Sequence, residues 1–323
     1  MQLRFQDKEH FFHDTARMLK SGLPLQRAWE QIARGRDRAA AAARRASPSV
    51  NTGLDEALVA GGFSGVDREI LAVGGQSGRL EEACLRLADY YAHLAAGKSR
   101  ALAASLYPLF ILHLGALLLS IPPAIIEGNP AMFFKQSALF LGTAYLAGGI
   151  CLLALRMLAW AFRSSVAADR WIRLIPAVGG FLREAALARF CLVLSLGIRS
   201  ADGVLSSLRR AGHASRSASV EAAATGAVPA IRAGAGFSDA LAASRAFPAD
   251  LERAFHVAEA SGRLEEEIAR WAGIYHERFF KRVDSLAEWL PRILYLLIVA
   301  LVVLRMFSLI SQITGVYSSV LEM

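Results

Sequence analysis

The chain has 323 residues, 54% of them hydrophobic, and its mean hydropathy of +0.37 is well above that of an ordinary soluble protein. A net charge of +8 can indicate nucleic-acid binding, but basic residues beside membrane spans explain it more simply, so no nucleic-acid partner is expected. The three cysteines, Cys84, Cys151 and Cys191, have no C-x-x-C spacing, which argues against a disulfide framework and a zinc site.

Residues 1–100 are predicted to form a small antiparallel helical bundle. The first residues lack the apolar core and the cleavage site of a signal peptide, so internal spans are expected to drive membrane insertion. Phe12, Ala16 and Leu19 form a helical stripe, and Pro24 suits the first position of the next helix. The resulting fold class is all-α.

Three later segments are candidates for membrane-spanning helices, at residues 101–126, 136–162 and 291–313. The first contains no charged side chain over 26 residues, which is long enough to cross a bilayer. Pro108 lies inside it and is expected to kink the helix. The third contains Arg305 near its end, where the side chain can reach the interface. About three spans are therefore expected.

Basic residues indicate how these spans are oriented. The positive-inside rule places residues 1–100 and 163–290 in the cytoplasm and the tail at 314–323 in the periplasm. His113, within the first span, is interpreted as a helix–helix hydrogen-bonding group, with a proton relay as the alternative. The cations that carry the orientation flank the spans at Lys98, Arg100, Arg163, Arg170, Arg173, Lys281, Arg282 and Arg292.

The two segments predicted to be cytoplasmic resemble each other. Residues 77–82, with the sequence SGRLEE, recur as residues 261–266 at an offset of 184. Tyr91 and Tyr275 match at the same offset. A repeat in constant register indicates two homologous helical bundles, called here copy one (residues 1–100) and copy two (residues 163–290).

The repeated motif has a structural interpretation and a functional one. Glycine permits a tight reversal between two helices or an N-cap, the glutamates complement the positive end of the second helix, and the leucines point inward. The alternative is a partner-docking surface, for which the two arginines are the best exposed candidates. The motif residues are Ser77, Gly78, Arg79, Leu80 and Glu81 in copy one, and Ser261, Gly262, Arg263, Leu264 and Glu265 in copy two.

No arrangement of residues indicates catalysis, a cofactor or a metal. The sequence has no P-loop motif and no G-x-S-x-G. His10 and His13 lie near Asp14, but a polar surface explains them better than a metal site. The basic residues between Arg34 and Arg45 are interpreted as a solvated helix face, with an acidic partner or lipid headgroups as the alternative.

The duplicated pattern resembles the F-domain family of the type II secretion system, which comprises the inner-membrane platform proteins of type II secretion and type IV pilus machines. Residues 71–80, LAVGGQSGRL, lead to a helix that reaches Tyr91 and then to Tyr107-Pro108. Residues 257–264, VAEASGRL, lead to Pro291 at the third span. Copy two keeps an acid of the family pattern at Glu259, whereas copy one has Gly75-Gln76. The chain is expected to resemble the shorter family members.

This resemblance implies a role without enzymatic activity. It implies that the chain couples a cytoplasmic hexameric assembly ATPase to the extraction of pilin or pseudopilin and to fibre assembly, as a homo-oligomer among other inner-membrane assembly proteins. Copy one, unattached at its N-terminus, is favoured as the docking domain. The alternative is a small membrane transporter, a membrane-embedded enzyme or a signalling scaffold. Replacement of His113 by Leu would distinguish a relay from these other roles.

Overall fold

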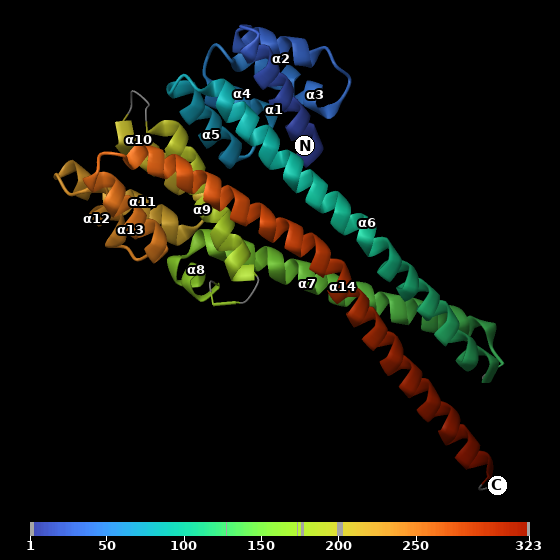
Figure 1. Cartoon of the computed structure of the whole chain (residues 1–323). Coiled ribbons are helices and arrows are strands. Elements are labelled where there is room, and N and C mark those ends of the chain that lie inside the picture. The colour runs from blue at the N-terminus through green and yellow to red at the C-terminus, as the bar shows by residue number, and fades with distance from the viewer. Residues whose placement is uncertain (1–2, 127, 173, 176–177, 199–202, 322–323) are drawn as a thin grey trace. The chain divides into compact units, whose positions relative to one another are not determined.

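The computed structural model describes residues 3–126, 128–172, 174–175, 178–198 and 203–321. Within these residues it contains 14 α-helices, one short 3-10 helix at Ser47–Ser49 and no strand. The all-α prediction is confirmed. The long helices α6, α7 and α14 and the shorter helices of the two copies are labelled in Figure 1.

Copy one consists of five short helices followed by the start of a long one. Gly62, with φ +82°, ends α4 in a left-handed conformation that glycine adopts at little cost. Ser64 and Asp67 form a capping box at the start of α5. The helices are α1 (Phe5–Lys20), α2 (Leu25–Ala33), α3 (Arg38–Ala46), α4 (Leu54–Gly61), α5 (Gly65–Gln76) and α6 (Leu80–Ile126).

Copy two repeats this series of helices in the same order. Its six helices are α9 (Val178–Gly197), α10 (Gly203–Ser215), α11 (Ala218–Arg232), α12 (Phe237–Ala242), α13 (Ala249–Ala260) and α14 (Leu264–Leu321). Two further helices, α7 (Pro130–Ser164) and α8 (Val166–Ile172), connect the copies. The correspondence extends the repeat seen in the sequence to whole elements.

The last helix of each copy and the following candidate span form one continuous helix. α6 has 47 residues and α14 has 58, and the helix continues past Pro108 and Pro291 respectively. By length and composition, α6, α7 and α14 are the helices able to cross a membrane in the described part of the chain. The expected spans at 101–126, 136–162 and 291–313 lie within these three helices. The side chain of Ile313 is not among those that the structure describes.

The chain forms two compact units, and the first of them contains both copies. This unit comprises Met1–Ala96 and Leu158–Val283. Its core is apolar and continuous from copy one to copy two. The copies meet where α5 packs against α9 and α10. Gly197 permits this approach, because a Cβ added there would lie 2.8 Å from Cγ1 of Val73.

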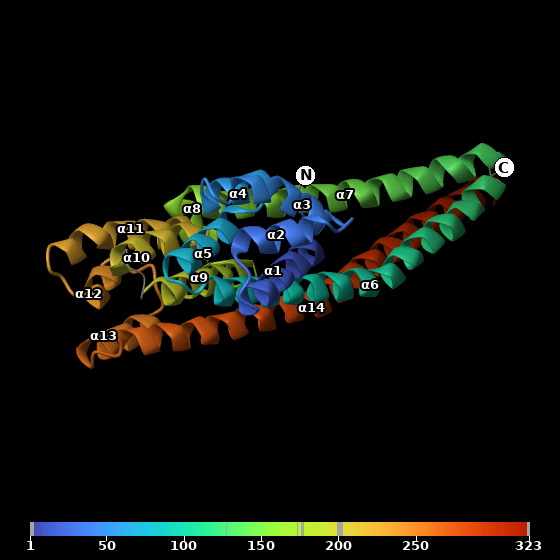
Figure 2. The ribbon, with the colours of Figure 1, turned by 90° about the horizontal axis from the view of Figure 1, so that it is seen from above.

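The second unit comprises Gly97–Met157 and Asp284–Met323 and contains most of the apolar segments. Leu112 and Ala116 of α6, Phe140 of α7 and Ile298 of α14 form its small buried cluster. Figure 2 shows α6, α7 and α14 as the long helices that supply these residues. Much of the remaining apolar surface of these helices is exposed, as expected for side chains that face lipid.

Candidate functional site

The repeated motif forms the same three-residue turn in both copies. Gly78, with φ +68°, lies between α5 and α6, and Gly262, with φ +70°, lies between α13 and α14. The backbone N–H groups of Arg79 and Arg263 each donate to a carbonyl of the preceding helix at 2.8 Å, Gly74 and Ala258 respectively. The glycines therefore supply the left-handed step that closes a helix. They lie one position too early to be N-caps.

The other motif residues support this turn. The hydroxyls of Ser77 and Ser261 donate to carbonyls of the preceding helix, Val73 at 2.8 Å and Ala258 at 3.1 Å. Leu80 and Leu264 pack against the core of the first unit. Glu81 and Glu265 occupy the first turn of α6 and α14, where their charge complements the helix dipole.

In copy one the arginine of the motif is used inside the molecule. Its Nε donates to Oε2 of Glu82 at 2.9 Å, and its Nη1 donates to the carbonyl oxygen of Ser195 in α9 at 3.1 Å. Nearby, Arg210 of α10 pairs with Glu69 of α5 at 3.3 Å. The face formed by α5 and the start of α6 is thus covered by copy two, with Arg79 as one of its contacts.

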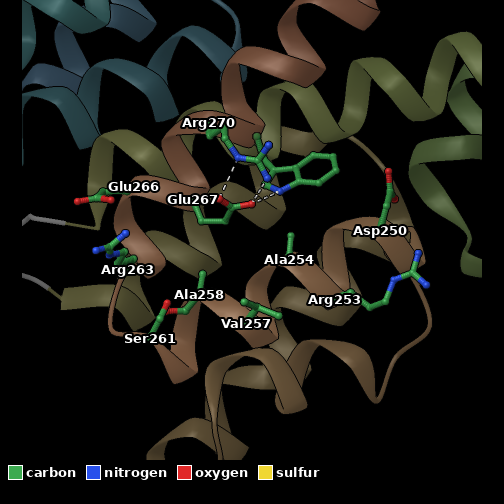
Figure 3. A pocket seen from close by; sticks show the side chains of 11 residues that line it. Asp250, Arg253, Ala254, Val257, Ala258, Ser261, Arg263, Glu266, Glu267 and Arg270 are labelled. Atoms are coloured by element: carbon green, nitrogen blue, oxygen red, sulfur yellow. Dashed lines mark hydrogen bonds and ion pairs between the residues drawn. The ribbon is translucent and has the colours of Figure 1, made fainter.

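In copy two the same arginine is exposed and lines an open groove. This groove, called here the α13–α14 groove, has a volume of about 580 Å³. Figure 3 shows the side chains that face it from α13, from the turn and from the first turns of α14. The guanidinium of Arg263 has no hydrogen bond or ion pair with any residue of the described chain. The lining residues are Asp250, Arg253, Ala254, Val257, Ala258, Ser261, Arg263, Glu266, Glu267, Arg270 and Trp271.

The floor of the groove is held by a hydrogen-bonded cluster on α14. The Nε1 of Trp271 donates to Oε1 of Glu267 at 2.8 Å, and Nε of Arg270 donates to its Oε2 at 2.9 Å. The hydrogen bond from Arg270 lowers the pKa of Glu267, so this carboxylate stays ionised. Among the cations of the groove, Arg253 and Arg263 have no carboxylate partner within the described residues. Glu266 likewise has no cation partner there, so the rim presents charges of both signs.

Comparison of the two copies shows that the described chain covers this surface in copy one and leaves it open in copy two. Val73 and Val257 correspond at the offset of 184, yet Val73 is 1% exposed and Val257 is 67% exposed. Glu69 corresponds to Arg253, so the charge is reversed at a position that pairs between the copies in copy one. The groove is therefore the uncovered counterpart of a surface that is an interface elsewhere in the same chain.

Glu259 lies beside this groove, but its carboxylate caps the start of α12. Its carboxylate accepts the backbone N–H groups of Phe237 at 2.6 Å and Ser238 at 2.8 Å, which are the first N–H groups of α12. It is an acidic cap supplied by a neighbouring helix. Glu259 therefore orders copy two and does not point into the groove.

The sequence identified Ser261 and Arg263 as site residues but not the other nine residues that line the groove, among them Arg253, Val257, Arg270 and Trp271. One signal was available in the sequence, because the change from Glu69 to Arg253 is a charge reversal within an otherwise matched repeat. The exposure of Val257 had no signal, since both copies have valine at this position.

The polar groups singled out in the spans lie within the second unit. Nε2 of His113 and the Tyr145 hydroxyl are 3.1 Å apart, which is the helix–helix hydrogen bond favoured from the sequence. Nδ1 of the same ring is 2.8 Å from the Leu109 carbonyl oxygen. Arg305 is half-buried on α14. A kink at Pro108 stays a prediction.

A family model and three curated relatives match the chain. The family described as type II secretion system (T2SS), protein F, matches residues 11–126 and 190–311. The type 4 fimbrial assembly protein PilC of Pseudomonas putida is 28% identical, over 92% of this chain and 80% of the relative. The type II secretion system protein F of Vibrio cholerae is 26% identical, over 87% and 76%. The type IV pilus assembly protein TapC of Aeromonas hydrophila is 26% identical, over 88% and 75%.

Proposed function

Because the chain belongs to the type II secretion system protein F family, we propose that it is the inner-membrane platform of a type II secretion or type IV pilus machine. The observation that carries this proposal is the family match, which covers most of both copies and the first and third candidate spans. The family is not a known enzyme family, and we propose a structural and coupling role without catalysis. The basic flanks favour cytoplasmic copies, a cytoplasmic N-terminus and a periplasmic C-terminus.

The α13–α14 groove is the proposed docking site of the cytoplasmic partner. Three observations support it: the groove is open, its rim carries the unpaired Arg253 and Arg263, and its centre exposes Val257. An apolar centre with a charged rim is the usual composition of a protein interface. The corresponding face of copy one is already covered, so copy two is the better docking domain, although copy one was favoured from its position in the chain.

The proposed partner is the hexameric assembly ATPase, docking through acidic side chains. Two uncompensated arginines attract carboxylates and can bind them bidentately. α14 begins directly after Arg263 and continues through Leu321 as a single helix. A displacement of the groove can therefore pass along α14, through Pro291, towards its apolar segment. We propose this helix as the element that couples ATP hydrolysis to pilin or pseudopilin extraction, with the platform acting as a homo-oligomer.

Charge reversal tests the docking site. In the full chain, Arg263→Glu is expected to reduce co-purification of the ATPase from native membranes at least tenfold, because acidic partner groups would meet a like charge. The matched control is Arg36→Glu, which makes the same change on the exposed basic segment of copy one. Both variants should insert in the membrane normally. Equal loss with both variants, or loss with Arg36→Glu alone, would move the docking site to the basic segment.

A further inference from the structure

A second cavity lies where copy one meets copy two, away from the α13–α14 groove. It has a volume of about 450 Å³, within the range of about 300–1,000 Å³ that is usual for small-molecule sites. Aromatic side chains of copy one and cations of both copies line it, including Phe5, Lys8, Phe63, Tyr90, Arg189 and Arg216. All of these residues belong to the first unit. We call it the Arg216 cavity.

The backbone holds Arg216 in an uncommon conformation. Its φ of +56° is left-handed, a conformation that is strained for a residue with a side chain. The neighbouring serines are fixed on both sides, because the Ser215 hydroxyl donates to the Gly212 carbonyl at 2.6 Å and Ser217 donates to the buried Asp169. Strain of this kind persists where the surrounding structure determines the position of a side chain.

The guanidinium of Arg216 is half-buried and uncompensated. No hydrogen bond or ion pair joins it to another residue in the part of the chain that the structure describes. Burial, together with the charges of Arg163 and Arg189, lowers its pKa. Arg189 adds a second positive charge, and its guanidinium is held in place because it donates to the carbonyls of Ala214 at 3.1 Å and Ser215 at 2.6 Å. A bound anion would relieve this repulsion.

The other cation of the cavity is already neutralised. Nζ of Lys8 pairs with the buried carboxylate of Asp67 at 2.5 Å and donates to the Tyr91 hydroxyl at 3.0 Å. The excess positive charge of the cavity therefore lies on Arg189 and Arg216. Paired guanidiniums match the oxygen atoms of a phosphate, and an anion with more than one charge suits them better than a single carboxylate.

We propose that the Arg216 cavity binds the phosphate group of a small phosphorylated molecule, whose organic part lies against Phe5 and Tyr90. Arg216 and the remaining donors of Arg189 hold the phosphate. A nucleotide and a phospholipid headgroup share this chemistry. The site lies between the two copies, so its occupant would bridge them and stabilise the first unit.

Calorimetry on the full chain in a non-ionic detergent tests this proposal with three probes: inorganic phosphate, adenosine monophosphate and glycerol 3-phosphate. Saturable binding of at least one is expected. Arg216→Gly should weaken it at least tenfold, while glycine accepts the left-handed backbone and preserves the fold. The matched control is Arg245→Gly, because Arg245 also has a positive φ, +51°, and does not line this cavity.

Each outcome decides something. Tighter binding of adenosine monophosphate identifies a nucleotide as the source of the phosphate, tighter binding of glycerol 3-phosphate identifies a lipid headgroup, and equal binding of all three identifies free phosphate. The absence of binding by every probe would overturn the proposal. So would binding that Arg216→Gly leaves unchanged, or that Arg245→Gly weakens to the same extent.

Discussion

Glu259 and Gly75 occupy corresponding positions in the two copies, and their surroundings explain why one copy carries the acid. In copy two the carboxylate caps α12, whose own N-cap residue, Gly236, supplies no side chain. In copy one a Cβ on Gly75 would lie 3.4 Å from Cδ2 of Leu54, so the same space is filled by a leucine. The departure from the family pattern thus replaces a polar cap with apolar packing.

Glu259→Ala should lower the stability of copy two by about 1 kcal/mol at neutral pH, the usual loss for a helix cap. Burial raises the pKa of this carboxyl, but hydrogen bonds from Ser238 and Phe237 outweigh burial, and the pKa of Glu259 is lower than usual. The stabilisation is therefore complete above the unfolded value of about 4.3 and is lost as the pH falls through the folded value.

Thermal unfolding of both proteins in detergent from pH 7 to pH 3 measures this effect. The difference between wild type and Glu259→Ala should shrink in acid. A difference that is absent at pH 7, or constant down to pH 3, would contradict a carboxylate cap.

A second pair of residues differs between the copies in the buried core. In copy one Asp67 is fully buried, pairs with Lys8 at 2.5 Å and accepts the Tyr91 hydroxyl. At the offset of 184, Asp67 corresponds to Leu251, which is also fully buried. One copy therefore has a buried ion pair where the other has a buried leucine.

Asp67→Leu alone should destabilise copy one by about 3–5 kcal/mol, because it leaves the ammonium of Lys8 buried and unpaired. The double variant Lys8→Leu with Asp67→Leu should recover most of this loss, since it leaves no buried charge without a partner. About 1 kcal/mol should remain lost with the cap that Asp67 gives to Ser64. Chemical denaturation of the four proteins in the cycle measures the coupling, and a double variant no more stable than the single one refutes the pairing.

At the scale of elements, the two turns of the repeated motif depend on one glycine each. Gly262→Ala should destabilise copy two by about 1 kcal/mol, because alanine is strained at φ +70°. Gly65→Ala is the control: its φ is not positive, and the nearest atom to an added Cβ is Nη2 of Arg68 at 3.8 Å. This control should unfold at the wild-type temperature or above it. Equal losses from the two variants would mean that helix packing and not turn geometry sets the cost.

The helical class, the repeat and the hinge motif could all be predicted from the sequence because they rest on local signals. Glycine in a turn, apolar residues at helical spacing and a run without charge act within one element. The sequence also indicates a polar helix that runs into a span after each copy, and α6 and α14 are continuous there. The Arg216 cavity could not be predicted from the sequence, because residues far apart in the chain line it.

The contact by which copy two covers copy one could not be predicted from the sequence, because it also depends on residues far apart in the chain. Arg79 and the Ser195 carbonyl are 116 positions apart, and only the folded chain brings them together. The two motifs look alike in sequence, and their different roles arise from tertiary packing. Neither Arg79 nor Arg263 could be assigned to an internal contact or to an open surface in advance.

At the scale of the whole molecule, the chain belongs to one family over both copies, yet the two copies differ in which surface is exposed. The family model matches both copies, and α6, α7 and α14 are each long and apolar enough to cross a membrane. One copy offers its α5–α6 face to the other, while the α13–α14 groove stays open. We propose that duplication produced two like surfaces and that the machine uses the one left uncovered.

The central claim is that the α13–α14 groove contacts the assembly ATPase, and site-specific photo-crosslinking in cells that assemble fibres tests it most directly. A photoreactive residue replaces Val257 in one strain and Val73 in another, so the same valine of the repeat is probed in both copies. The account predicts an adduct with the ATPase from position 257 and none from position 73. An adduct from position 73 with none from position 257 would contradict it.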